Sequence, residues 1–323
     1  MPSSWPYGPW EQLLRCPALA LDAEKNLVSA CGIFSGGVLY TVVAAVGGPR
    51  GQGIFGNLFY FSGLSLWILC LILAAGGVSR AVLQDLGGGP RMGLPQVLSY
   101  LRHRWKTLVL IPLAFCGLAL AGILAQTFMA IAGSIPAIGP VLYALSFALG
   151  VAFSLLAVLA TLVHILGLPL YPAALGSQDA GVAAVIRELL ELIRRRPGPI
   201  LLVEGGLAVA CGAAGWVIAT LLRISLHLTV AISQPAMLGE RFQRLVAGLP
   251  EPLAPIFEWM AGPVPIYFLG GDGPAYYPFA GFLMGLSFLA LLSAAFAYPF
   301  TLLVTGGTAL YVSLRSTEGS ANS

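Results

Sequence analysis

The sequence has little charge. Only 9% of its 323 residues are Asp, Glu, Lys or Arg, whereas 58% are hydrophobic, and its mean hydropathy is +0.89. A typical soluble domain carries about 25% charged residues, so this composition excludes a soluble globular protein. The net charge of +3 is too small to indicate a nucleic-acid partner, and we expect none.

Histidine and cysteine are also scarce. The five cysteines have no metal-ligand spacing, and their odd number argues against a disulfide framework. The three histidines stand alone, and the sequence contains no evident Ser–His–Asp set, carboxylate pair or Cys/His cluster. We therefore predict no catalytic residue, no metal and no cofactor, and a protein that is not an enzyme.

Long apolar runs dominate what remains. A membrane-spanning helix needs about 20 apolar residues, and six runs reach that length: 27–46, 54–78, 107–131, 141–168, 199–222 and 279–312. The sequence thus predicts an all-α, polytopic integral membrane helix bundle with amphipathic interfacial elbow helices. Five spans fall within residues 27–222, and the sixth within 277–315.

Three further segments flank or separate these spans. Residues 1–26 contain Trp and Tyr side chains typical of the headgroup layer, and we expect an interfacial segment there. Residues 223–276 begin with a strand-like alternation, but a lone strand would leave its backbone unpaired, so a helical continuation of the fifth span is favoured. That region is expected to form an amphipathic cap on the outer surface. Residues 316–323 are expected to be a disordered cytoplasmic tail.

Two amphipathic segments end in basic residues and lead into spans. Residues 94–106 and 181–196 place apolar side chains at helical spacing, with charges off that face. Such helices lie along a bilayer rather than across it, so we interpret both as cytoplasmic elbows. A duplication and the ordinary geometry of cytoplasmic loops explain this similarity equally well. The predicted headgroup-binding residues are Arg102, Arg104, Lys106, Arg194, Arg195 and Arg196.

The loop charges orient the chain. Most Lys and Arg residues fall in the N-terminal segment, the two elbow loops and the C-terminal tail. The positive-inside rule therefore places both termini in the cytoplasm. Membrane lipids are the expected partners, together with a protein partner in a membrane complex.

Several local patterns together resemble an uncharacterised family of bacterial multi-pass membrane proteins. Residues 76–80 read Gly-Gly-Val-Ser-Arg, Arg104-Trp105 precedes the third span, residues 171–174 read Tyr-Pro-Ala-Ala, and residues 307–315 read Gly-Thr-Ala-Leu-Tyr-Val-Ser-Leu-Arg. The resemblance implies about six spans in a bacterial inner membrane. It implies no activity, so it assigns no catalytic residue.

Glu204 is the sharpest candidate for chemistry within the spans. It lies five residues after Pro199, about 7.5 Å along a helix, and an intramembrane carboxylate is a functional hypothesis by default. His164 lies at a similar depth in the fourth span, so the two side chains could form a polar pair that gates a pathway or relays a proton. We favour the alternative that Glu204 extends toward the arginines at 194–196 and that His164 bonds a carbonyl.

Small residues at helical spacing mark candidate helix contacts. The helix-packing positions expected from this pattern are Gly32, Gly36, Gly212, Gly215, Gly281 and Gly285.

The function predicted from these features is non-catalytic: a scaffold or accessory subunit of a membrane assembly. A small-molecule or lipid transporter that uses Glu204 is the alternative. A lipid-modifying enzyme would need polar residues that converge at the outer cap, where the sequence offers only Arg223, His227, Glu240 and Asp272.

Overall fold

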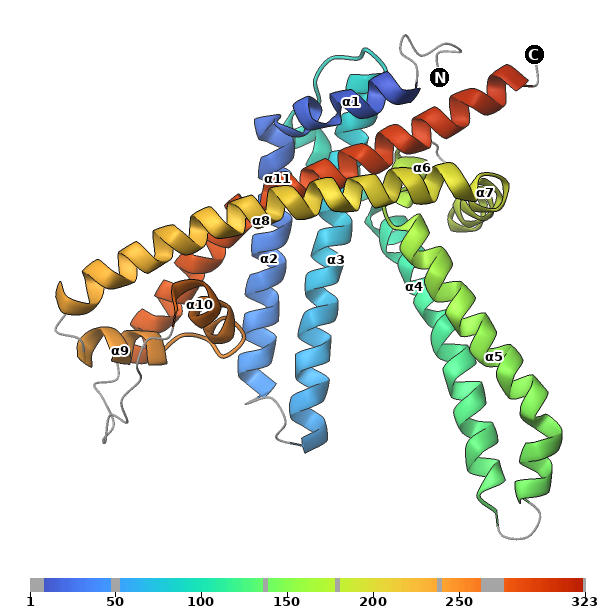
Figure 1. Ribbon diagram of the computed structural model, residues 1–323, viewed down its shortest axis with the longest axis horizontal. Coiled ribbons are helices and arrows are strands. Elements are labelled where there is room, and N and C mark those ends of the chain that lie inside the picture. Colours follow the sequence, from blue (N-terminus) through green and yellow to red (C-terminus); the bar gives the residue numbers. More distant parts are fainter. Residues whose placement is uncertain are drawn as a thin grey trace. The chain divides into compact units, whose positions relative to one another are not determined.

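The computed structural model of the chain describes residues 9–47, 53–135, 139–177, 181–236, 240–262 and 276–321. Within these ranges the chain forms eleven α-helices and no strand (Figure 1), which confirms the all-α prediction. The helices are α1 (Pro9–Ala20), α2 (Ala23–Gly47), α3 (Gly53–Leu86), α4 (Leu94–Gly133), α5 (Gly139–Gly167), α6 (Tyr171–Ser177), α7 (Val182–Arg195), α8 (Pro197–Ala236), α9 (Glu240–Ala247), α10 (Ala254–Ala261) and α11 (Tyr276–Ala321).

Six of these helices are long and apolar enough to cross a bilayer, by length and composition, and each overlaps one of the six predicted runs. They indicate a membrane-embedded, multi-pass chain. Helix α8 runs without a break past residue 223, so the expected helical continuation of the fifth span is confirmed. The candidate spans are Ala23–Gly47, Gly56–Leu86, Leu94–Ala132, Tyr143–Gly167, Pro197–Ser233 and Pro278–Ser316.

The chain divides into two compact units, and three of the four longest helices contribute to both. Unit 1 comprises Met1–Leu14, Ser79–Gly206 and Gly306–Ser323. Unit 2 comprises Arg15–Val78 and Leu207–Thr305. Helices α3, α8 and α11 therefore each begin in one unit and end in the other.

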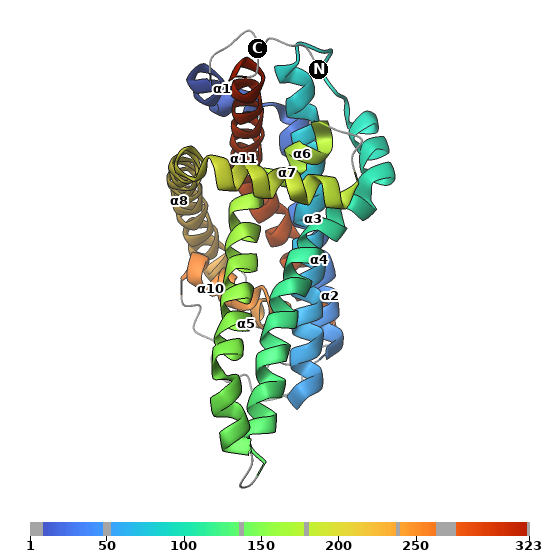
Figure 2. The same cartoon turned by 90° about the vertical axis from the view of Figure 1, so that its right-hand side faces the viewer.

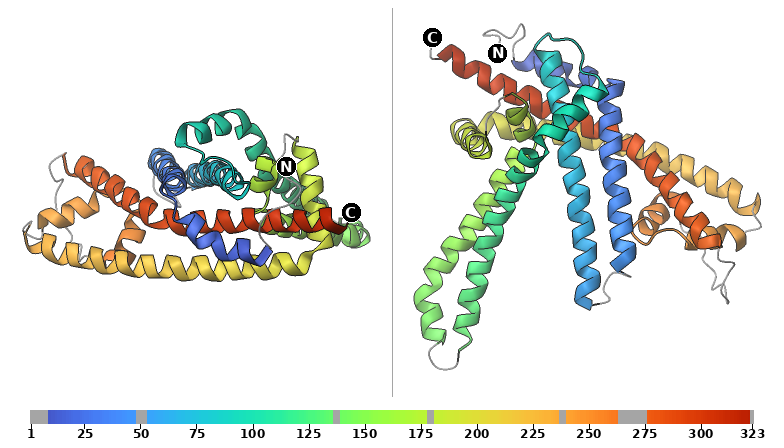
Figure 3. Two further views of the ribbon diagram at one scale, coloured as in Figure 1. Left: turned by 90° about the horizontal axis from the view of Figure 1, so that it is seen from above. Right: turned by 180° about the vertical axis from the view of Figure 1, so that it is seen from behind.

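In unit 2, α2 and α3 lie side by side (Figure 3). A Cβ atom on Gly32 would overlap Ala74 of α3, and one on Gly36 would overlap Trp67. The two backbones therefore approach too closely for a side chain at either glycine. The Tyr40 ring stacks on Trp67 with the ring centroids 5.7 Å apart.

Helices α9 and α10 pack their apolar faces against α8 and α11 of the same unit. Phe257 of α10 meets Phe288 of α11 edge to face, with centroids 5.3 Å apart. At Gly281 a Cβ atom would overlap the backbone of Gly248, so α11 passes directly beside the end of α9. Residues 263–275 of the expected outer cap, including Asp272, lie outside the described residues. The buried cluster comprises Leu226, Val230, Phe242, Val246, Leu249, Phe257, Met260, Ala261, Phe288 and Leu292.

The corner between α1 and α2 is closed by polar side chains. Asp22 caps α2, because its Oδ1 accepts hydrogen bonds from the backbone N–H groups of Glu24 (3.0 Å) and Lys25 (3.3 Å). The Lys25 Nζ donates to the Leu19 carbonyl at 3.3 Å. Burial raises the pKa of the nearby Cys16 thiol to about 12, so this cysteine is a buried apolar residue rather than a reactive one.

In unit 1, α4 and α5 form an antiparallel hairpin (Figure 2). Their backbones come close at Gly122, where a Cβ atom would lie 2.8 Å from the Phe153 carbonyl oxygen. Farther along, the Ser154 hydroxyl donates to the Gln126 side chain at 2.7 Å. The outer faces of both helices expose large apolar side chains, as expected for helices surrounded by lipid.

The first predicted elbow is not a separate helix. Residues 94–106 are the opening turns of α4, which continues without a break to Gly133. The helix therefore has no break at residue 107, where the third span was expected to begin. Helix α4 changes direction along its length (Figure 2), and Pro112 lies within it.

The structure also differs from the predicted disordered tail at residues 316–321. Helix α11 continues to Ala321, and only residues 322–323 lie outside the described ranges. No proline follows Pro299, and an established helix extends at little cost because each added residue gains one hydrogen bond.

Candidate functional site

Unit 1 is organised around α6, a short helix whose described side chains are nearly all buried. Tyr171 is 2% exposed, and burial raises the pKa of its hydroxyl well above the usual range. Pro172 fits the first turn, where a missing N–H removes no helical bond. At Gly307 of α11 a Cβ atom would overlap the Pro169 carbonyl, so α11 passes directly beside the chain entering α6.

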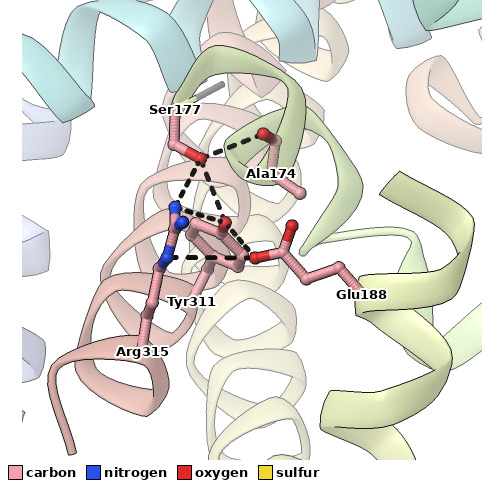
Figure 4. Close-up of polar contacts among 5 residues, drawn as sticks. All are labelled: Ala174, Ser177, Glu188, Tyr311 and Arg315. Carbon is pink, nitrogen blue, oxygen red and sulfur yellow. Dashed lines mark hydrogen bonds and ion pairs between the residues drawn. The ribbon is translucent and has the colours of Figure 1, made fainter. Parts of the chain in front are cut away.

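Four polar side chains meet at the end of α6, and we call them the α6–α7–α11 junction: Ser177, Glu188, Tyr311 and Arg315 (Figure 4). Tyr311 is only 1% exposed, and its hydroxyl donates to the Glu188 carboxylate at 2.8 Å. The Arg315 guanidinium lies 4.0 Å from the same carboxylate oxygen. Helix α7 is thereby tied to the end of α11.

The two hydroxyls of the junction are closely linked. Tyr311 gives its single proton to Glu188, so the one proton of Ser177 is shared between two acceptors, the Tyr311 hydroxyl and the Ala174 carbonyl, each 3.0 Å away. Arg315 donates to Tyr311 at 3.3 Å and to Ser177 at 3.4 Å. Each hydroxyl is thus both donor and acceptor, so the side chains hold one another in place.

A second arginine reaches α6 from the end of α3. Arg80 donates from Nη1 to the Gly176 carbonyl, and its guanidinium lies 5.8 Å from the centroid of the Tyr100 ring. Cations suit the C-terminal end of a helix, where free carbonyls and the helix dipole are negative. Next to Arg80, the buried Ser79 hydroxyl lies 2.8 Å from that of Thr308 on α11.

The junction residues were not predicted as a site from the sequence. A signal was nevertheless present, because three of the patterns that carry the family resemblance converge on α6. Residues 76–80, 171–174 and 307–315 supply Arg80, Tyr171 and Tyr311 respectively. Glu188 was interpreted only as a charge off the apolar face of its helix, and spacing within one helix cannot reveal a partner on another.

The predicted Glu204–His164 pair is not joined by a direct contact. In the described residues, no hydrogen bond or ion pair connects them, and Glu204 Oε1 and His164 Nδ1 are each buried without a hydrogen-bond partner. The His164 ring instead lies 5.9 Å from the Phe115 ring. The expected reach of Glu204 to the arginines at 194–196 is likewise not seen among these residues. A pair bridged by water remains a prediction.

The predicted headgroup-binding residues are mostly exposed. Arg102, Lys106, Arg194 and Arg195 are exposed, whereas Arg104 and Arg196 are half-buried. Arg195 forms an ion pair with Glu191 one turn earlier. Both sets of cations therefore lie on the surface of unit 1.

The remaining glycines differ in their surroundings. At Gly285 a Cβ atom would lie 2.7 Å from Pro250, which is a close contact. At Gly215 it would meet Phe296 at 3.9 Å, an ordinary contact, and at Gly212 nothing lies within 4 Å. Of these two glycines of α8, Gly215 faces a neighbouring helix, whereas Gly212 meets no other described residue within that distance.

Among the residues that the structure describes, no group of three or more His, Cys, Asp or Glu side chains could hold a metal ion. Comparisons of the chain with protein family models, with curated proteins and with solved structures find no match.

Proposed function

We propose that this protein is a non-catalytic multi-pass membrane scaffold or accessory subunit, and that α7 presents its contact surface. The observation that supports this is the two-sided environment of α7. Val185, Leu189 and Leu192 are buried on one side, and Glu188 is bonded to the buried Tyr311. Arg187, Glu191 and Arg194 are exposed on the other.

A helix held in this way is a rigid platform with a charged outer face. Apolar contacts and the α6–α7–α11 junction fix its orientation, so binding to its outer face would not have to order the helix first. Anionic headgroups or an acidic surface of a protein partner complement the cations of that face. The proposed setting is a bacterial inner membrane with both termini in the cytoplasm.

The test is recovery of the partner from membranes in a mild detergent. Reversing the charge of the exposed arginines, in Arg187→Glu with Arg194→Glu, should lower recovery of the partner at least tenfold, because the two sites would repel an acidic surface. Arg241→Glu on α9, another exposed arginine on a short helix, is the matched control. Unchanged recovery with the α7 variant would refute the scaffold proposal.

The topology is testable independently. Reporter fusions at the C-terminus and within residues 87–93 should both report the cytoplasmic side, because the basic residues near both points favour that side. A periplasmic signal at either point would overturn the orientation.

A transporter is the second candidate, and the buried, unpaired carboxylate oxygen of Glu204 favours it. A carboxylate oxygen that is buried without a partner in an apolar helix is costly unless it has a use. Glu204→Gln keeps the shape and removes the charge. Loss of a growth or uptake phenotype at normal expression would favour transport, and an unchanged phenotype would favour the scaffold.

A further inference from the structure

Two side chains that lie against each other each carry a buried hydrogen-bond donor without an acceptor. The donors are Nε of Arg80 and the hydroxyl of Tyr100, and neither has a partner within the described ranges. Buried donors in proteins are almost always bonded, so each unpaired one calls for an explanation such as a bound molecule. Two of them in one place indicate a ligand rich in acceptor oxygens.

The two donors come from elements whose positions are fixed. Arg80 is anchored at its other end, where Nη1 donates to the Gly176 carbonyl. Its guanidinium lies over the Tyr100 ring at 5.8 Å. The guanidinium is therefore held over the phenol ring, and a guanidinium edge is well suited to a planar or tetrahedral oxyanion.

The charge at this place is positive. The Arg80 guanidinium lies over the Tyr100 ring, and Arg104 follows Tyr100 by four residues on α4. Asp85, on the last turn of α3, is the nearby acid in the sequence, and both Asp85 and Arg104 make other interactions. An anionic ligand would be attracted here and a cationic one repelled, whereas a neutral carbonyl would use the donors but not the charge.

We propose that Arg80 and Tyr100 form a binding site for a phosphate oxyanion, supplied by the headgroup of an anionic phospholipid. Arg80 follows the apolar run of α3, and Tyr100 precedes the apolar part of α4, so both lie at the depth expected for cytoplasmic headgroups. The site adds a lipid ligand to the proposed membrane scaffold. It rests on that proposal only in assuming that these ends of α3 and α4 lie at the cytoplasmic surface of the membrane.

The experiment measures lipid binding by the purified full chain with native mass spectrometry. Phosphatidylglycerol is compared with monogalactosyl diacylglycerol, which has the same tails and no phosphate. Tyr100→Phe removes one donor and keeps the ring under Arg80, and should weaken phosphatidylglycerol binding about tenfold. Tyr143→Phe, at a tyrosine of α5 that contacts Phe147, is the matched control and should leave binding unchanged.

A second variant tests Arg80 while keeping a cation that can bond the Gly176 carbonyl of α6. Arg80→Lys keeps a positive charge that can reach Gly176 but has no Nε–H, so it should also weaken binding while the protein stays folded. Equal binding of the two lipids by the native chain would overturn the proposal. Phosphatidylglycerol binding that Tyr100→Phe leaves unchanged would overturn it as well.

A third arm separates the two sources of phosphate. Stabilisation against heat by phosphatidylglycerol but not by millimolar inorganic phosphate supports a headgroup site. Equal, Tyr100-dependent stabilisation by inorganic phosphate supports the oxyanion site with free phosphate as its ligand. Partner recovery is measured on the α7 variants, which retain Tyr100, and lipid binding on the Tyr100 and Arg80 variants, which retain α7. The scaffold proposal and the lipid-site proposal can therefore fail independently.

Discussion

The contacts within unit 1 differ in kind from the contacts within unit 2. In unit 1, Tyr311, Glu188 and Arg315 connect α7 and α11 through hydrogen bonds and an ion pair. In unit 2, α2 meets α3 at Gly32 and Gly36, and α10 meets α11 through the Phe257–Phe288 ring pair. At these positions polar side chains connect the helices of unit 1, whereas close apolar packing connects those of unit 2.

The difference reflects the surroundings of each contact. Within hydrocarbon, apolar helix faces gain little from leaving lipid, so close backbone approach and good packing must hold helices together. Near the end of a span, water and headgroups are close, and ionised side chains can be accommodated. Substitutions in each unit can test whether apolar packing contributes more to stability within hydrocarbon than polar contacts do near the ends of spans.

The largest effect is expected in the apolar cluster of unit 2. Phe288→Ala should lower the free energy of unfolding in detergent by about 3 kcal/mol, the low end for Phe→Ala, because lipid-like solvent rather than water surrounds the unfolded helices. Phe279→Ala removes a ring of the same helix that is 65% exposed and is the control. Equal losses for the two variants would mean that the cluster does not stabilise unit 2.

A smaller loss is expected in unit 1. Tyr311→Phe deletes the donor to Glu188, and we expect a loss of about 2 kcal/mol, as for other hydrogen bonds to charged groups. Glu188→Gln combined with Tyr311→Phe should cost less than the sum of the single changes, because both remove one interaction. Strict additivity in chemical unfolding would contradict the junction.

A matched pair of hydroxyl contacts sharpens the comparison. Ser29 bonds Thr301 at 2.7 Å in unit 2, and Ser79 bonds Thr308 at 2.8 Å in unit 1. Ser29→Ala and Ser79→Ala should each cost about 0.6 kcal/mol, the average for side-chain hydrogen bonds between membrane helices. Clearly unequal losses in thermal unfolding would show that the two surroundings change the strength of the same bond.

The smallest effect is expected at the surface of α7. Arg195→Ala breaks the ion pair with Glu191, whose two side chains are 56% and 47% exposed. The loss should be at most about 0.5 kcal/mol and should vanish at high salt, because exposed ion pairs are screened. A loss above that of Tyr311→Phe would reverse the ranking of buried and exposed polar contacts.

Apolar run length was sufficient to predict the spans, since a helix that crosses lipid must satisfy its own backbone. Helical periodicity also located α7 and placed the buried Val185 and Leu189 on its apolar face, but it did not identify the buried Leu192. The start of α4 and the end of α11 were not predicted correctly, and both errors have the same cause. Polar and basic residues at 94–106 and 316–321 were interpreted as a change of structure, but polarity does not end a helix unless a breaker or a cap accompanies it.

The candidate site was less predictable than the fold. Ser177, Glu188 and Tyr311 belong to three helices, and their contacts join residues 123 and 134 positions apart. Local patterns report which face of a helix is apolar, but not which side chain from a distant helix meets it. Glu204 was conspicuous because a carboxylate in an apolar run stands out, whereas Arg80 and Tyr311 lie near span ends, where polar residues are common.

Helix α11 contributes its first part to unit 2 and its last part to unit 1. It is also the last described helix to leave the ribosome. The Ser29 contact needs Thr301, and the Glu188 contact needs Tyr311, so neither unit can form all of its contacts until these residues have been synthesised. A chain released before residue 276 would lack both contacts.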